Sequence, residues 1–169
     1  MDAKLLAAAK AAFPKTANAI TLGAIVHDGE CRAEPGITIP LAMLTRHGLI
    51  AGATGTGKTK TLQLMAEQLS SQGVPVFLAD IKGDLSGMAT PGQANDKITA
   101  RSTEVGQQWV GTAYPTEFLS LGGLGNGIPI RAAVSSFGPT LLAKVLGLNE
   151  TQESSLGLVF HYADSKQLW

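Results

Sequence analysis

The sequence lacks the features of a secreted, disulfide-bonded or membrane-spanning protein. Cys31 is the only cysteine among 169 residues, so no disulfide can form within the chain. No apolar run reaches the roughly 18 residues that a membrane span needs, and no secretory leader pattern begins the chain. We therefore expect a cytoplasmic protein with no membrane partner.

Aromatic residues and net charge are also scarce. Aromatic residues make up 5% of the chain, and thirteen Lys and Arg balance thirteen Asp and Glu. This balance excludes the overall basic field of many nucleic-acid binders, so any contact with DNA has to be local or come from an assembled ring. Trp109, Tyr114 and Phe118 have no Lys or Arg between them. We interpret them as packing residues at the edge of a core rather than as base-stacking residues.

What the chain does contain favours an α/β protein. Hydrophobic residues make up 44% of the sequence and glycine occurs 20 times, which suits aliphatic strands joined by glycine-containing turns. Residues 3–13 predict a helix, residues 20–26 a strand that turns at residues 27–29, and residues 37–39 a short extended piece. We assign residues 1–45 to a small amino-terminal appendage and residues 46–169 to the main domain.

The central motif is G-x-x-x-x-G-K-[ST], which residues 52–59 spell as GATGTGKT. A predicted strand at residues 48–51 precedes it, and apolar residues at helical spacing from Leu62 to Leu69 follow it, with Gly73 closing the helix. Residues 74–79 then form an apolar run suited to a strand covered on both faces. Strand, glycine loop, helix and strand make one βαβ unit, which predicts a parallel sheet.

The motif predicts a phosphate-binding site for ATP or ADP with Mg²⁺. Its glycines let backbone N–H groups curl around phosphate oxygens at the positive end of a helix. Lys58 is the candidate catalytic cation for the β- and γ-phosphates, Thr59 is the candidate Mg²⁺ ligand, and Lys60 lies beside them. A glycine-rich turn that matches by chance is the alternative, and the flanking strand and helix argue against it. The predicted cofactor-binding residues of the motif are Gly52, Ala53, Thr54, Gly55, Thr56, Gly57, Lys58, Thr59 and Lys60.

Two further candidates follow the apolar run of residues 74–79. Asp80 and Lys82 lie in the sequence DIKGD, at the carboxyl end of the predicted sheet, where open α/β folds place their ligands. We predict that Asp80 is catalytic and faces the phosphates, and that Lys82 contacts the nucleotide. Asp80 is not interpreted as a Walker B aspartate, because its strand directly follows the helix of the glycine loop. The alternative is a solvated loop in which the two side chains form a local ion pair.

The remaining elements are predicted from shorter signals. Residues 95–105 predict a short helix, residues 115–131 two strands around a glycine-rich segment at residues 122–127, and residues 141–146 a helix that ends at Gly147. Asn149 and Gln152 have the spacing of a helix-capping pair at the start of another helix.

The runs RHGLIAGATGTGKT at residues 46–59 and VPVFLADIKGDLSG at residues 74–87 resemble the HerA-like branch of the HerA/FtsK ATPases, of the YjgR-type bacterial kind. Residues 130–134, 138–142 and 148–153 are similar to the same family. The resemblance implies a RecA-like (ASCE) P-loop NTPase with a mainly parallel sheet flanked by helices. It also implies hexameric rings that couple ATP hydrolysis to movement along DNA.

In that family the Walker B strand, polar sensor and arginine finger come later than the segments seen here. We therefore expect the chain to be the amino-terminal part of the domain, and to bind ATP but hydrolyse it poorly. Arg101 and Arg131 are candidates for contacting a neighbouring subunit's nucleotide, against the alternative of solvated surface residues. Two other functions stay open: a nucleotide-gated assembly protein without motor activity, and a small-molecule kinase.

Overall fold

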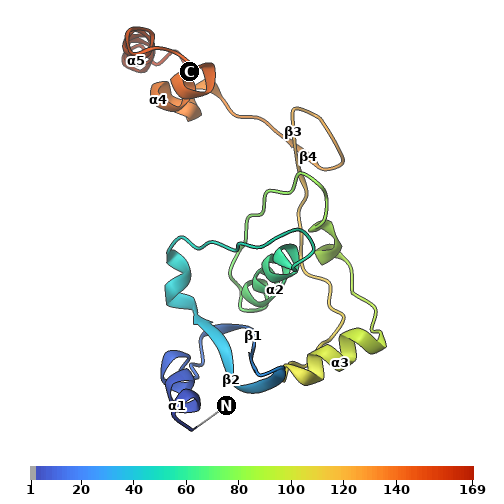
Figure 1. Ribbon diagram of the computed structural model, residues 1–169. Helices are drawn as coiled ribbons and strands as arrows, with labels where there is room; N and C mark the ends of the chain where they lie inside the picture. Colours follow the sequence, from blue (N-terminus) through green and yellow to red (C-terminus); the bar gives the residue numbers. More distant parts are fainter. Residues whose placement is uncertain (1–2) are drawn as a thin grey trace. The chain divides into compact units, whose positions relative to one another are not determined.

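The computed structural model describes residues 3–169, which form two compact units, one running to Thr116 and the other spanning Glu117–Trp169 (Figure 1). In chain order the first unit contains α1 (Ala3–Ala12), β1 (Ala19–His27), β2 (Glu30–Pro40), the 3-10 helix η1 (Leu41–Thr45), α2 (Lys58–Ser71), the 3-10 helix η2 (Ser86–Ala89) and α3 (Asp96–Glu104). The second unit contains β3 (Leu119–Leu121), β4 (Ile128–Ile130), α4 (Val134–Leu146) and α5 (Glu150–Ser165). The predicted mixture of helices and strands is therefore present.

An antiparallel hairpin of β1 and β2 opens the first unit. His27 pairs with Glu30, and the turn between them holds Asp28 at φ 51° and Gly29 at φ 79°. Two consecutive residues with positive φ match the right-handed twist of the flanking strands, which is why Asp-Gly is favoured in such turns. The predicted strand and its turn are confirmed.

The helix α2 packs against β1 and is tied to it by the Gln68 side chain. Its amide accepts a hydrogen bond from the Thr21 N–H (2.7 Å) and donates one to the Thr21 carbonyl (2.8 Å). This pair satisfies the backbone of Thr21 much as a neighbouring strand would. Ile20 on β1 and Ala66 on α2 are both buried in this unit. The hairpin thus fixes the helix that begins at the glycine loop.

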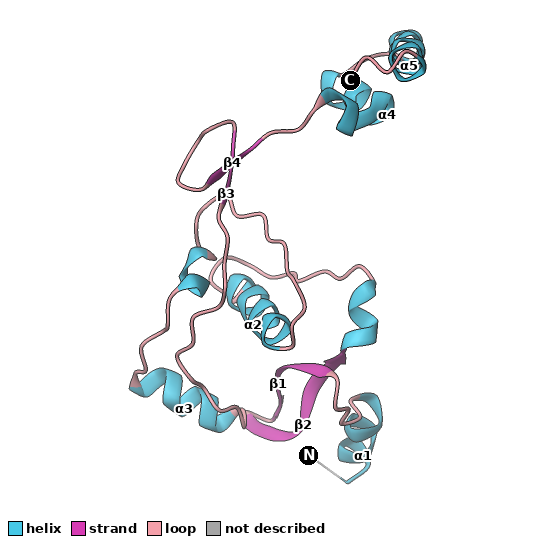
Figure 2. Cartoon of the chain, turned by 180° about the vertical axis from the view of Figure 1, so that it is seen from behind, coloured by secondary structure: helices cyan, strands magenta, loops and turns pink. Residues whose placement is uncertain are grey.

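The predicted parallel sheet around α2 is not formed by the described residues. Residues 48–51 and 74–79 carry no regular secondary structure, and Figure 2 draws both as loop. Phe77 is 81% exposed, although its run is apolar enough for a covered strand. A strand requires ladder hydrogen bonds from a partner, and among residues 3–169 no partner runs beside either segment. The prediction of strands at residues 48–51 and 74–79 is therefore wrong for this structure.

The second unit begins with a short parallel pair, in which Leu119 is opposite Ile128 and Leu121 is opposite Ile130. The predicted two strands around the glycine-rich segment are confirmed. Gly127 lies so close to the preceding strand that a Cβ there would be 2.7 Å from the Phe118 carbonyl oxygen. Glycine is therefore required where the chain comes back to pair.

Two helices, α4 and α5, complete the second unit. The Asn149 side chain accepts a hydrogen bond from the Gln152 N–H, and the Gln152 side chain accepts one from the Asn149 N–H, both at 3.0 Å. This capping box confirms the predicted helix start. Gly147 ends α4 in the left-handed region, at φ 65°. Within residues 3–169, none of the helices has the length and apolar character needed to cross a membrane.

Candidate nucleotide-binding site

The glycine loop, residues 52–59, leads directly into α2. Gly55 and Gly57 have φ values of 80° and 95°, a region that residues with a side chain rarely adopt. Gly57 is the N-cap of α2, so Lys58 and Thr59 are the first two helical residues. The motif residues that were predicted to bind phosphate are thus brought to the positive end of a 14-residue helix.

The loop is held together by the carbonyl oxygen of Ala53. It accepts hydrogen bonds from the Thr56 hydroxyl (2.7 Å) and from the Lys58 ammonium (2.7 Å). Gly52 lies close against the same group, since a Cβ there would be 2.5 Å from the Thr56 hydroxyl oxygen. The Lys58 charge is therefore carried at the loop itself rather than extended into solvent.

The amino-terminal turn of α2 has an unusual charge distribution for a helix start. It holds Lys58 and Lys60 and no acidic residue, and its cap Gly57 provides no side-chain acceptor. Helix geometry leaves the first N–H groups without intrahelical partners, and cations are disfavoured at this end of the dipole. Both features are unfavourable for the isolated helix and both become favourable beside an anion.

A cavity of about 310 Å³ adjoins this turn and is lined by Thr59, Asp80 and Lys82 among others. The structure thus brings the predicted Mg²⁺ ligand and the two later candidates to one cavity, although residues 74–79 do not form the predicted strand. The Lys82 side chain makes no hydrogen bond or ion pair among the described residues, and the alternative of an Asp80–Lys82 ion pair is not observed.

Asp80 shapes its own loop. One carboxylate oxygen accepts hydrogen bonds from the N–H groups of Lys82 (3.0 Å) and Gly83 (2.9 Å), and the other accepts one from Leu85 (2.8 Å). These bonds, that from Leu85 foremost, lower the pKa of Asp80 below its ordinary value of 3.8. The Asp84 backbone contributes in the same direction, so the Asp80 carboxylate is engaged largely by its own loop.

We expect Asp80→Asn to loosen this loop in a pH-dependent way. The asparagine side chain places an NH₂ donor where a carboxylate oxygen accepts the Leu85 N–H in the wild type, so two donors face each other. Because the folded-state pKa is lowered, the carboxylate stabilises the fold above pH 3.8 and loses that effect as the pH falls through the folded-state value. The variant should therefore have a lower Tm than the wild type at neutral pH and an equal Tm in strong acid. An equal Tm at both pH values would contradict this role.

Gln63 is a site residue that the sequence patterns did not single out. It is a buried polar residue on α2, 9% exposed, whose side chain accepts a hydrogen bond from the Lys60 ammonium (2.8 Å) and donates one to the Asp84 carbonyl (2.9 Å). It therefore connects the first turn of α2 to the loop that Asp80 organises. The only available signal was its spacing, one helical turn from Lys60 and from the buried Ala66.

Two substitutions of Gln63 separate its two contacts. Gln63→Glu keeps an acceptor for Lys60 but cannot donate to the Asp84 carbonyl, whereas Gln63→Leu loses both bonds. We expect each variant to lower the free energy of unfolding by about 0.5–1.5 kcal/mol, measured by urea denaturation. Hydrogen exchange at residues 81–85 should accelerate in both. A Gln63→Glu variant more stable than the wild type would show that only the Lys60 contact matters.

Gly52→Ala should disturb the glycine loop through one atom, the Thr56 hydroxyl oxygen. We expect weaker nucleotide binding and a loss of about 1–3 kcal/mol in unfolding free energy, because the added methyl forces that hydroxyl away from the Ala53 carbonyl. Adding Thr56→Ala removes the oxygen and should restore most of the loss, whereas adding Thr56→Ser should not. Calorimetry and denaturant melts measure both effects, and equal behaviour of the two double variants would contradict the geometry.

Comparison with known proteins supports the resemblance found in the sequence. Searches of curated proteins and of solved structures found no match to the chain. The sequence model of the helicase HerA-like C-terminal family, however, matches residues 27–169, which include the glycine loop and the Asp80 segment. That match covers most of the chain, which therefore belongs to the HerA-like helicase family.

Proposed function

We propose that residues 52–59 bind the phosphates of ATP together with Mg²⁺. The observation that carries this proposal is the first turn of α2, which combines a glycine cap, two lysines and no acidic residue. A polyphosphate at this position accepts hydrogen bonds from the free N–H groups and neutralises the charges of Lys58 and Lys60. The positive φ of Gly55 and Gly57 supports the proposal, because it turns the backbone of the loop without a steric cost.

Within this proposal, Lys58, Thr59 and Asp80 have distinct roles. The Lys58 ammonium moves from the Ala53 carbonyl to the β- and γ-phosphates, where both partners of the hydrogen bond are charged and the bond is stronger. The Thr59 hydroxyl would be the protein ligand that holds Mg²⁺. The ion would neutralise the charge of the terminal phosphates. Asp80, whose carboxylate is engaged by N–H groups of its own loop, would act through a water molecule of the site rather than hold the metal directly.

For the whole protein we propose a HerA-type ATPase that moves along DNA as an oligomeric ring. Family membership supports this assignment, and ring assembly would allow loops of several subunits to contact the phosphate backbone together. The formal net charge of zero is consistent with weak DNA binding by a single chain. Any affinity of the isolated chain should therefore decrease steeply as salt increases.

Calorimetry tests the nucleotide site first. Titration with a non-hydrolysable ATP analogue should give saturable binding that is tighter in the presence of Mg²⁺ than in EDTA. No binding at millimolar analogue, together with no rise in Tm, would overturn the proposal.

The ATPase rate of the full-length protein with and without DNA then tests the motor. Stimulation by DNA supports translocation. Hydrolysis that DNA leaves unchanged, with nucleotide-dependent assembly in sedimentation experiments, would identify a nucleotide-gated assembly protein instead.

A further inference from the structure

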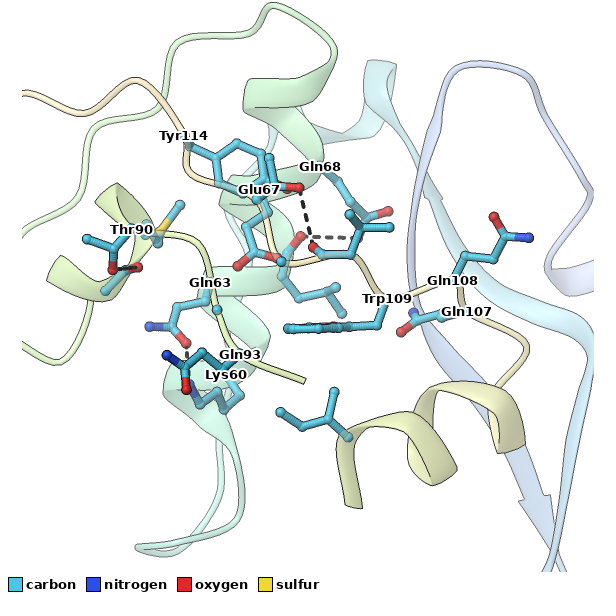
Figure 3. A pocket seen from close by; sticks show the side chains of 18 of the residues that line it. Lys60, Gln63, Glu67, Gln68, Thr90, Gln93, Gln107, Gln108, Trp109 and Tyr114 are labelled. Carbon is cyan, nitrogen blue, oxygen red and sulfur yellow. Dashed lines mark hydrogen bonds between the residues drawn. The ribbon is translucent and has the colours of Figure 1, made fainter. Parts of the chain in front are cut away.

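A second and larger cavity, of about 620 Å³, lies in the first unit beside α2 (Figure 3). Its lining includes Lys60, Gln63 and Glu67 of α2 together with Gln107, Gln108, Trp109 and Tyr114 of a later segment. Its volume lies within the roughly 300–1,000 Å³ that is usual for small-molecule sites. Residues 52–59 of the glycine loop do not line it.

The Trp109 indole is held in a defined position at this cavity. A Cβ on Gly92 would be 3.1 Å from Cζ2 of the indole, and a Cβ on Gly111 would be 3.4 Å from its Cη2 and 2.2 Å from the Gly92 carbonyl oxygen. Two glycines are therefore needed for backbone and ring to approach this closely. Trp109 is nevertheless 38% exposed, so part of a large aromatic surface has no protein partner. The interpretation of Trp109 as a core-edge packing residue is incomplete for this reason.

Amide side chains with free hydrogen-bonding groups lie at both ends of the indole. In Figure 3, Lys60, Gln63 and Gln93 lie to one side of Trp109 and Gln107 to the other, whereas the Gln108 side chain points away from the ring. Gln63 and Gln68 are engaged by the protein, but among the described residues the side chains of Gln93, Gln107 and Gln108 make no hydrogen bond. An amide presents both a donor and an acceptor, so Gln93 and Gln107 can each pair with a ligand edge that alternates the two.

The charges at the cavity argue for a ligand without net charge at this position. Lys60 and Glu67 have opposite signs, and burial raises the pKa of Glu67 above its ordinary value, with the Lys60 charge opposing that shift. A phosphate group would gain little between them. A hydrocarbon would leave the free amides desolvated without partners, which is unfavourable.

We propose that this cavity binds a nucleobase, which stacks on Trp109 and is hydrogen bonded at its edges by the side chains of Gln93 and Gln107. A base provides a planar aromatic face together with alternating donors and acceptors, which is the combination that the cavity complements. The site is separate from the glycine loop, so it takes the base of a free nucleoside or of a single-stranded nucleic acid. The two sources share this chemistry and are separated by experiment.

Fluorescence of Trp109 measures the binding directly. The chain contains two tryptophans, and Trp169→Phe keeps an aromatic ring beside Phe160 while leaving Trp109 as the only indole. In this background, adenosine, guanosine, cytidine and thymidine should quench the fluorescence saturably, and ribose 5-phosphate should not. Tighter binding of a short oligodeoxynucleotide than of any nucleoside would identify single strands as the source, whereas equal binding would identify free nucleosides.

Calorimetry on substituted chains tests the assigned contacts. Trp109→Ala should weaken binding of the best nucleoside roughly 5- to 150-fold, and Trp109→Phe should retain part of the affinity. Lys58→Ala should leave nucleoside binding unchanged, which distinguishes this site from the phosphate site. If no base binds, if ribose 5-phosphate binds as well as the nucleosides, or if Trp109→Ala has no effect, the proposal is overturned.

Discussion

Lys58→Ala should weaken the binding of Mg²⁺–ATP roughly 10- to 100-fold while the chain stays folded. The substitution removes the cation that the loop holds 2.7 Å from the Ala53 carbonyl, at the start of α2. A charge-assisted hydrogen bond to a buried phosphate contributes about 1.5–3 kcal/mol. Alanine is at least as good a helix former as lysine, so the cost to α2 itself is small. ADP should lose less affinity than ATP, because it lacks the γ-phosphate.

The matched control is Lys97→Ala, which removes a lysine from the first turn of a different helix, α3. It should bind ATP and ADP as the wild type does, and circular dichroism should show both variants folded. Equal affinities for ATP in wild type and a folded Lys58→Ala variant would mean that residues 52–59 do not act as a phosphate loop. The proposed ATPase activity would then lose its structural basis.

Gly57→Val should abolish measurable nucleotide binding. Gly57 has φ 95° and caps α2, and a Cβ at this position would meet no atom within 4 Å. The effect is therefore one of backbone strain alone: a side chain disfavours this region by about 1–2 kcal/mol, and a β-branched residue by more. Relief of the strain rotates the N–H groups of Gly57 and Lys58 away from the phosphate position, so several hydrogen bonds are lost at once.

Gly48→Val is the control for this prediction. Gly48 also has open space around its Cβ position, but its φ is not in the left-handed region. The Gly48→Val variant should therefore bind nucleotide with wild-type affinity in the same calorimetric titration. Gly57→Ala should fall between the two, because alanine is strained at positive φ but lacks the branched side chain. Normal ATP binding by Gly57→Val would show that the loop conformation is not required.

The helices and their ends were predictable because their signals are local. The Asn149–Gln152 cap, Gly73 after α2 and Gly147 after α4 act over a few residues, and each is present in the structure. The hairpin turn at Asp28 and Gly29 belongs to the same class. In each case the hydrogen bonds that define the feature join residues close in sequence.

The parallel sheet was not predictable in this way. The apolar character of residues 74–79 indicates a segment that favours burial, but a strand forms only where a distant segment provides ladder hydrogen bonds. The sequence pattern contains no information on whether that partner is in place. Prediction of the domain boundary at residues 45 and 46 depends on the same sheet and stays a prediction.

The candidate site likewise has a part that is encoded locally in the sequence and a part that depends on distant contacts. The glycine loop is one continuous motif, so its residues and the helix that follows were read directly from the sequence. Gln63 was not found, because its role depends on the Asp84 carbonyl, 21 residues away. The cavity at Trp109 was not found either, since its lining combines residues of α2 with residues around Trp109 that are distant from α2 in the sequence.

The most direct test of phosphate binding by residues 52–59 is an NMR titration of the ¹⁵N-labelled chain with Mg²⁺ and a non-hydrolysable ATP analogue. The account predicts that the N–H resonances of Gly55, Gly57, Lys58 and Thr59 shift first and saturate together. In Lys58→Ala the remaining loop resonances should shift less, and saturate only at roughly 10- to 100-fold higher analogue concentration. Shifts confined to residues around the Trp109 cavity, or no shifts at millimolar analogue, would contradict it.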